Sequence, residues 1–159
     1  MKFADQEKLN EVLSVYKGMR FPFETSEFVI GNILDVPVEI CTKIWLYHIL
    51  PMVTVRAIMD IPMWPSEKSS YRPKSWEIQH MRSGNSEHTF RGKGATDWTC
   101  KDFAENKDQF LKLIIGHTKY TRIAVYDSFI HCDYKAQDGK RYIFDSTPSS
   151  EWTIKRVIN

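Results

Sequence analysis

The sequence predicts an α+β fold in which N-terminal helices pack on a small antiparallel sheet. Apolar residues recur at helical spacing in the first third of the chain, whereas short alternating runs dominate the last third. The chain has 159 residues, 42% of them hydrophobic, which is enough for one domain with a buried core. We therefore expect a single domain over residues 1–159, with a helical part at about 1–60 and an α+β part at about 61–159.

Composition and charge argue against several classes of protein. The 22 Lys and Arg against 20 Asp and Glu leave a formal net charge of +2, so a dedicated nucleic-acid binder is not expected. Three cysteines are too few for a disulfide framework. The first residues turn polar at once, which predicts no secretory signal, and the apolar run 44–55 is too short to span a membrane. We expect a cytoplasmic protein without membrane insertion; the pattern leaves the oligomeric state open.

Two helices are predicted in the first third. The first follows a cap at Asp5 and has apolar residues at helical spacing, namely Leu9, Val12, Leu13 and Tyr16. The second is expected to start at 35–37, because proline is tolerated in the first turn of a helix. Pro51 should either kink this helix or begin a new turn that carries Met52 and Val55.

The middle third, residues 65–93, is rich in Ser, Gly, Arg and Lys. It is predicted to be a long loop with one short helix near Pro73, and loops of this length are often functional. In the last third, a helix is expected to begin with a capping arrangement of Asp102 and Glu105 and to end at Gly116. Strands are predicted at 95–100, 122–126, 129–134 and 141–145, with Asp138-Gly139 as a hairpin turn.

Two histidines and one aspartate form a candidate metal site. Two imidazoles and a carboxylate are a common catalytic zinc set. Gly92 and Gly94 would let the chain turn back between His88 and Asp97 without a Cβ penalty, so that both side chains reach one ion. A metal between the two strands would then meet His88, Asp97 and His131.

Strand alternation divides the residues around this site between two faces. It places His131 and Asp133 on one face of their strand and Cys132 on the other, and all three cysteines are expected to be buried thiols. The remaining histidines have no partner spacing that requires a metal, and these are His48, His80 and His117.

The order of these segments resembles the zinc D-alanyl-D-alanine carboxypeptidases and related peptidoglycan endopeptidases, whose fold is shared with the hedgehog signalling domain. Their signature is Ser-x-His, a glycine-bearing turn, Ala-x-Asp and a later aromatic-aliphatic-His-x-Asp strand. The matching residues are Ser86-Glu87-His88, Gly92, Gly94, Ala95-Thr96-Asp97 and Phe129-Ile130-His131-Cys132-Asp133. Two more features resemble the family, the segment Ser69-Ser70-Tyr71-Arg72-Pro73 and Arg141 after the second histidine. The match extends over about 61–145.

The resemblance implies a zinc peptidase with zinc bound by His88, Asp97 and His131. It also implies that Arg72 lies near the carboxylate of the substrate and that Ser86 lies within the site. The alternatives are that Arg72 is a solvated loop arginine and that Ser86 is only a turn residue. The implied substrate is the peptidoglycan stem peptide. The implied reaction is that of a D-Ala-D-Ala carboxypeptidase or of a stem or cross-link endopeptidase. A phage or prophage lysis enzyme that waits in the cytoplasm and acts on the bacterial wall after release fits this picture.

The general base is the residue on which the sequence departs from the resemblance. Many relatives carry a glutamate or histidine three residues before the second ligand histidine, where this chain has Ser128. Asp127 and Asp133 are the remaining catalytic candidates. Asp133 could instead orient a ligand histidine or pair with Arg141 across a hairpin.

A further departure concerns spacing, and the missing base keeps other functions open. The interval from His88 to Asp97 is longer than the usual family spacing, and residues 91–93 are expected to absorb the difference. Without a carboxylate at position 128, a zinc-containing binding module of the same fold is the alternative function. An α+β domain whose motifs coincide by chance is a third hypothesis, and it predicts no bound metal.

Overall fold

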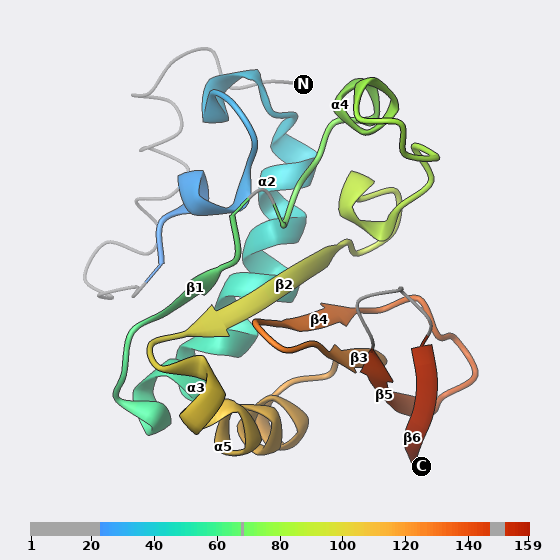
Figure 1. Cartoon of the computed structure of the whole chain (residues 1–159). Coiled ribbons are helices and arrows are strands. Elements are labelled where there is room, and N and C mark those ends of the chain that lie inside the picture. The colour runs from blue at the N-terminus through green and yellow to red at the C-terminus, as the bar shows by residue number, and fades with distance from the viewer. Residues whose placement is uncertain (1–22, 68, 147–151) are drawn as a thin grey trace.

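The computed structural model describes residues 23–67, 69–146 and 152–159. Within these ranges the chain forms several helices and a six-stranded sheet, so the α+β class is confirmed (Figure 1). The first predicted helix, around Leu9 to Tyr16, lies outside the described residues.

The helices and strands follow one another in an order close to the predicted one. The helical elements are η2 (Thr25–Phe28), η3 (Ile33–Asp35), α2 (Val38–Ile44), the π-helical turn η4 (Trp45–Ile49), α3 (Leu50–Met59), α4 (Lys74–Gln79), η5 (Glu87–Thr89) and α5 (Phe103–His117). The strands are β1 (Met63–Pro65), β2 (Ala95–Cys100), β3 (Arg122–Val125), β4 (Ile130–Asp133), β5 (Arg141–Ser146) and β6 (Trp152–Ile158).

The helices α2 and α3 form one continuous rod that is interrupted only by the π-helical turn. Pro37 is the residue before α2, and Pro51 lies in the first turn of α3, as the sequence predicts for prolines at helix starts. Pro51 has no N–H to donate to the carbonyl of Tyr47 one turn earlier, and this carbonyl accepts a hydrogen bond of 2.8 Å from the Tyr134 hydroxyl. The π-helical turn thus lies directly before Pro51, at the point where the rod contacts the residue that follows β4.

The same rod, Val38–Met59, is long and apolar enough to cross a membrane when only length and composition are considered. Its buried apolar side chains, however, belong to the two hydrophobic clusters, and a core helix of a soluble protein meets the same criterion.

The sheet is mixed, which corrects the prediction of a purely antiparallel sheet. The strand order is β1-β2-β4-β3-β5-β6, and β3 and β5 pair in parallel while the other neighbours are antiparallel. The predicted hairpin at Asp138-Gly139 is therefore wrong. Gly139 does adopt a left-handed φ of 79°, but β2 and β3 already occupy both edges of β4, so the chain must cross to the far side of β3.

The hydrophobic core lies between the helices and one face of the sheet (Figure 1). Trp98 on β2 and Ile130 and Cys132 on β4 point into this core, as strand alternation predicts. All three cysteines are buried and unpaired, which confirms that expectation. The opposite face of β2 and β4 is consequently left for polar side chains.

The boundaries of α5 differ from the predicted ones. Asp102 has a left-handed backbone and its side chain caps nothing, so the predicted capping arrangement is wrong. The helix also continues through Gly116 to His117, because the Thr118 hydroxyl donates a 2.7 Å hydrogen bond to the Ile114 carbonyl and closes the last turn.

Candidate metal centre

Two of the candidate ligands face each other across neighbouring strands. Asp97 on β2 and His131 on β4 are direct partners in the antiparallel register. Side chains of directly opposed residues lie on the same face about 5 Å apart at Cβ. The pairing therefore brings the carboxylate and the imidazole together on the face opposite the core.

The third candidate, His88, reaches the same place from the turn η5. The Ser86 side chain accepts a 3.2 Å hydrogen bond from the His88 N–H and so starts this turn. Gly94 returns the chain to β2 with φ +89°, and a Cβ there would lie 2.3 Å from the Phe90 ring. Gly92 needs no such freedom, so only one of the two predicted glycines is required by the backbone.

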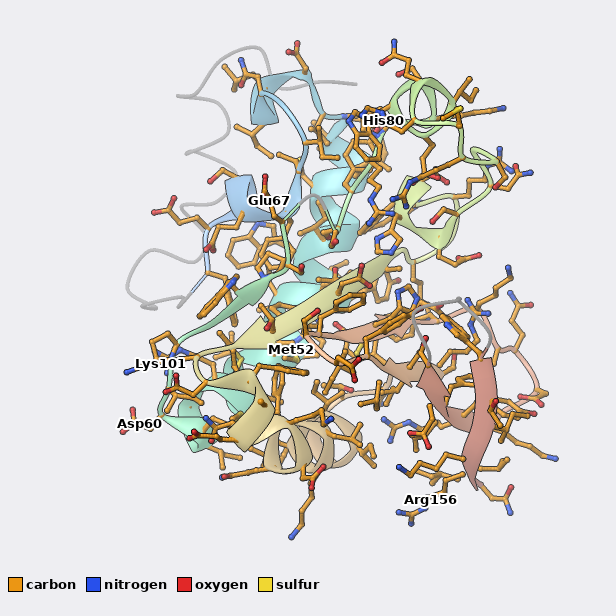
Figure 2. All side chains as sticks on the ribbon, in the orientation of Figure 1. Met52, Asp60, Glu67, His80, Lys101 and Arg156 are labelled. Atoms are coloured by element: carbon orange, nitrogen blue, oxygen red, sulfur yellow. The ribbon has the colours of Figure 1, made fainter. Side chains whose placement is uncertain are left out.

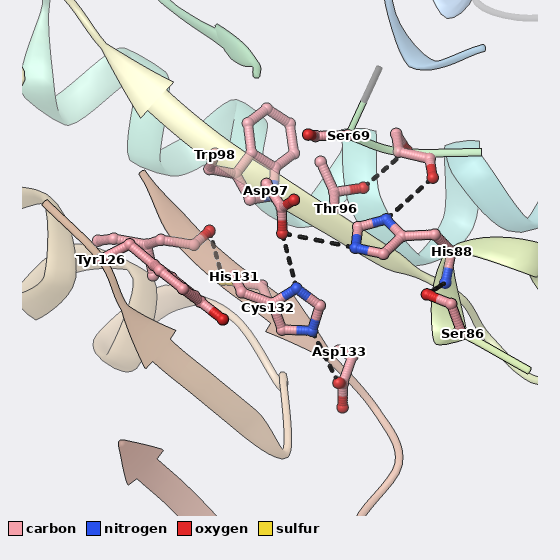
Figure 3. Close-up of polar contacts among 12 residues, drawn as sticks. Ser69, Ser86, His88, Thr96, Asp97, Trp98, Tyr126, His131, Cys132 and Asp133 are labelled. Atoms are coloured by element: carbon pink, nitrogen blue, oxygen red, sulfur yellow. Dashed lines mark hydrogen bonds and ion pairs between the residues drawn. The ribbon is translucent and has the colours of Figure 1, made fainter. Parts of the chain in front are cut away.

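The three side chains form a compact buried group (Figure 3). One ligand atom from each residue can be chosen so that all lie within 4.8 Å of one another. Asp97 Oδ1 is 2.6 Å from His131 Nδ1 and 3.6 Å from His88 Nε2. The exposed fraction is 5% for His88 and Asp97 and 8% for His131.

Each histidine is oriented by a partner on the ring nitrogen that faces away from Asp97. His88 Nδ1 donates to the Ser70 carbonyl at 3.0 Å, which leaves Nε2 with its lone pair directed at the group. His131 Nε2 lies 2.9 Å from an Asp133 carboxylate oxygen, which leaves Nδ1 beside Asp97. Metal-ligating histidines have such partners on the second nitrogen as a rule. The donor set and its supports fit a metal ion.

The electrostatics of the group depend on carboxylates as well as on burial. Burial lowers the pKa of His88 to about 4, so this imidazole is neutral at pH 7. Burial also disfavours a charged His131, but Asp97 and Asp133 outweigh it and raise the pKa of that imidazole to about 9. Burial opposes a charged Asp97, yet the two histidines and Arg72 hold its pKa below the usual range. An anionic oxygen is therefore present between the two imidazoles at neutral pH.

Asp133 is buried and fully engaged by its neighbours. Its carboxylate accepts hydrogen bonds from Arg122 Nε at 2.8 Å, from Arg122 Nη2, from His131 and from the Lys135 backbone N–H. Burial opposes its charge, but these donors hold its pKa well below the usual range. Of the roles considered for Asp133, these contacts favour orientation of His131.

The alternative prediction, that Asp133 pairs with Arg141, is wrong. Arg122 is the partner because β3 lies directly beside β4 and places Arg122 opposite Asp133 in the register. Arg141 instead donates to the backbone carbonyls of Tyr120 and Ile115, at 2.8 and 2.7 Å.

The other predicted site residues have different surroundings. The Arg72 guanidinium is buried, 3.7 Å from Asp97 Oδ2 and 3.4 Å from Glu77 Oε1, so it does lie beside the candidate ligands. The Ser86 hydroxyl accepts the His88 N–H and caps the turn η5 that contains His88. Asp127 is exposed between β3 and β4, and among the described residues it has no hydrogen bond or ion pair to the group.

Four contributors to the site were not found by sequence reasoning. They are the Ser70 carbonyl, Glu77, Arg122 and Trp152. The Trp152 indole lies 5.2 Å from the His131 ring, with the Arg122 guanidinium 4.8 Å from its centre. Of these, only Arg122 has a detectable signal, because it is a charged residue at the start of a predicted strand.

No family model, curated protein or solved structure is significantly similar to this chain. The assignment of a function therefore depends on the site itself and on the motif order in the sequence.

Proposed function

We propose that this protein is a zinc-dependent hydrolase of peptide bonds in bacterial peptidoglycan, either a D-Ala-D-Ala carboxypeptidase or a stem or cross-link endopeptidase. One observation carries the proposal. The three residues that the motif order selects as ligands, which are 43 positions apart at most in the sequence, form one buried group of His88, Asp97 and His131. In this proposal the protein is a phage or prophage lysis enzyme that remains cytoplasmic until it is released to the wall.

The donor set supports zinc in preference to calcium or magnesium. Two imidazoles and one carboxylate suit zinc and leave one tetrahedral position open, whereas calcium and magnesium prefer sites made only of oxygen atoms. When bound, zinc supplies a Lewis acid that polarises a carbonyl and activates water at neutral pH.

The residues of the chain have separate tasks in this proposal. Asp133 holds the His131 ring by its Nε2 and so directs Nδ1 toward Asp97. Ser70 does the same for His88 through its carbonyl. Arg72 is a buried cation beside Asp97, and a guanidinium there suits the carboxylate of a stem peptide.

A second function, a zinc-containing binding module, is favoured by a specific observation. Asp133 is held by Arg122 and His131, Asp127 and Ser128 are exposed, and within the described ranges no carboxylate beside the group remains without a partner. Glu77 is also buried but pairs with Arg72. A protein with this site can bind a metal and a partner without a base that accepts the proton of water.

The first test measures the metal content of the purified protein by mass spectrometry. We expect about one zinc per chain in the wild type and almost none in His131→Ala. His117→Ala is the matched control, because it removes an exposed histidine from the end of α5 and should leave the zinc content unchanged. Zinc that persists in His131→Ala would contradict the site.

The second test separates the hydrolase from the binding module. The zinc-loaded protein is incubated with purified peptidoglycan, and soluble products are analysed by chromatography and mass spectrometry. Free D-alanine indicates a carboxypeptidase, and new amino termini within the stem or cross-link indicate an endopeptidase. If zinc is bound but no product forms, the binding module is favoured. If Asp133→Ala and Asp127→Ala both retain hydrolysis, neither residue is the general base.

A further inference from the structure

A cleft rich in cations lies beside the candidate metal centre. Its volume is about 1030 Å³, and it is lined by residues of α2 and η4, of the segment from η5 to β2, of the connection from α5 to β3 and of the connection from β4 to β5. Its lining residues include neither His88 nor Asp97 nor His131, so it is a separate feature of the surface.

The cleft concentrates positive charge. Five lysines line it, namely Lys43, Lys93, Lys119, Lys135 and Lys140, together with Arg91 and Arg141. Glu87 is the one acidic residue among the lining residues that the structure describes, and it forms an ion pair of 3.6 Å with Lys135. Because the whole chain has a formal charge of only +2, this clustering creates a local positive potential that favours an anionic ligand.

Two buried polar atoms at the cleft have no protein partner. In the described part of the chain, the buried side-chain atoms without a hydrogen bond are Thr121 Oγ1 and Arg141 Nη2, and both residues line the cleft. Native proteins leave few buried polar groups unsatisfied, because each one has a free-energy cost. Both atoms carry hydrogens that they can donate, and both are buried from solvent, so an acceptor oxygen in the cleft supplies the missing partner only when neighbouring side chains shift.

The chemistry of the lining distinguishes between anionic ligands. Arg141 uses its Nε and Nη1 on backbone carbonyls, so it offers no planar two-point fork to a carboxylate, and Arg91 Nη2 donates to the Gly84 carbonyl at 3.4 Å. Lysines make up five of the seven cations of the lining. The lysines are single-point donors, which suit tetrahedral phosphate oxygens approached from several directions. Lys93 Nζ lies 5.1 Å from the ring centres of both Tyr47 and Tyr134, so these rings are covered rather than free to stack on bases.

We propose that this cleft binds the phosphate groups of a linear phosphate polymer. Its volume exceeds that of one phosphate, and its cations come from four separate segments, so several successive phosphates can be contacted at once. Binding here does not depend on a metal or on the hydrolase proposed above.

The test measures the affinity for fluorescently labelled inorganic polyphosphate of defined length by fluorescence anisotropy, with a chelator present. We expect the double variant Lys119→Glu/Lys140→Glu to bind at least about tenfold more weakly than the wild type. The dependence of affinity on salt should also become less steep, by about 0.7 in the logarithmic slope for each lost contact.

The matched control has the same change in net charge at another part of the surface. Lys101→Glu/Lys112→Glu alters two exposed lysines that do not line the cleft. Lys101 lies at the end of the molecule where Asp60 is found, and its backbone N–H bonds to the Pro62 carbonyl (Figure 2). The control should retain wild-type affinity. Equal weakening in both double variants, or no binding by the wild type at low salt, would overturn the proposal.

A third variant tests the unpartnered hydroxyl. Thr121→Val removes it with little change in volume, and we expect about tenfold weaker polyphosphate binding with no loss of thermal stability. Unchanged affinity would argue against an acceptor at this point.

Two competitor polymers test the chemical class: tighter binding of single-stranded DNA with the same number of phosphates, or equal binding of polyglutamate, would overturn the assignment to a phosphate polymer. Neither result bears on the metal content of the protein, so the two proposals fail separately.

Discussion

The two faces of the central sheet each bury histidine, and they do so in different ways. On the core face, His48 donates from Nε2 to the Lys93 carbonyl at 3.0 Å and accepts at Nδ1 from the Tyr120 hydroxyl at 3.2 Å. On the opposite face, His131 lies between the carboxylates of Asp97 and Asp133. Burial lowers the pKa of His48 to about 3, whereas the carboxylates overcome burial and raise the pKa of His131 to about 9.

A buried histidine becomes a candidate ligand only through its partners. His48 is less exposed than His131, yet both of its ring nitrogens are used by neutral groups, the Lys93 carbonyl and the Tyr120 hydroxyl. At His131 both nitrogens face carboxylates, so one nitrogen can exchange its proton for a metal while the other stays oriented.

Zinc should stabilise the protein by binding at the His131 face of the sheet and not at the His48 face. At a thousandfold excess over the dissociation constant, added zinc is expected to raise the free energy of unfolding by about 4 kcal/mol, measured by chemical denaturation. His48→Gln should keep this increment, because His48 is not in the candidate group, and His131→Gln should lose it. An equal increment in both variants would remove the distinction between the faces.

Removal of Asp133 should be costly even without metal. Asp133→Ala leaves the partly buried Arg122 without its anion and the buried His131 with only one of its two carboxylates, and we expect a loss of about 3 kcal/mol in the free energy of unfolding. Asp127→Ala is the control, since the same substitution in an exposed turn should change stability by less than about 0.5 kcal/mol. Similar small losses in both variants would show that the network contributes little.

The core-face histidine should make stability fall in acid. The folded protein keeps His48 neutral down to about pH 3, whereas the unfolded chain protonates it near its ordinary pKa of 6.5. The unfolded state therefore binds more protons as the pH falls, and His48 should contribute a loss of about 1.4 kcal/mol per pH unit between about pH 6 and 4. His48→Gln should remove this contribution, and it appears as the wild type minus variant difference in unfolding free energy across that range. A constant difference would contradict the neutral state of His48.

The smallest effect is expected when the Tyr120 hydroxyl, which links Trp98 and His48, is removed. The Tyr120 hydroxyl accepts from Trp98 Nε1 at 3.1 Å and donates to His48. Tyr120→Phe leaves both without this partner, and a loss of about 1 kcal/mol is expected in thermal or chemical unfolding. Tyr142→Phe, whose hydroxyl bonds the exposed Asp138, is the matched control and should be nearly neutral.

Period-two alternation allowed both faces to be predicted from the sequence. It separated His131 and Asp133 from Ile130 and Cys132, and the structure confirms this division. The α+β class, the strand 95–100 and the short helix after Pro73 are confirmed as well, because each depends on local pattern or on proline chemistry.

What could not be predicted depends on which strands are neighbours. Arg122 is the partner of Asp133 because β3 lies between β4 and β5. Without that strand order, the turn residues Asp138-Gly139 predict a hairpin. The Ser70 carbonyl that orients His88 is a backbone group, so no residue type indicates it. The Tyr120–His48 bond joins residues 72 positions apart on two different elements.

The bond from the Tyr134 hydroxyl to the Tyr47 carbonyl has a consequence for the order of folding. It joins residues 87 positions apart, so the π turn receives this donor only after β4 has docked. We expect the helical rod to form early, because its contacts are local, and its middle to be completed later. Amide hydrogens around the turn should accordingly exchange faster in Tyr134→Phe, while those at the far end of α3 keep their protection. The middle of a long helix in this protein is thus completed by a residue that follows strand β4.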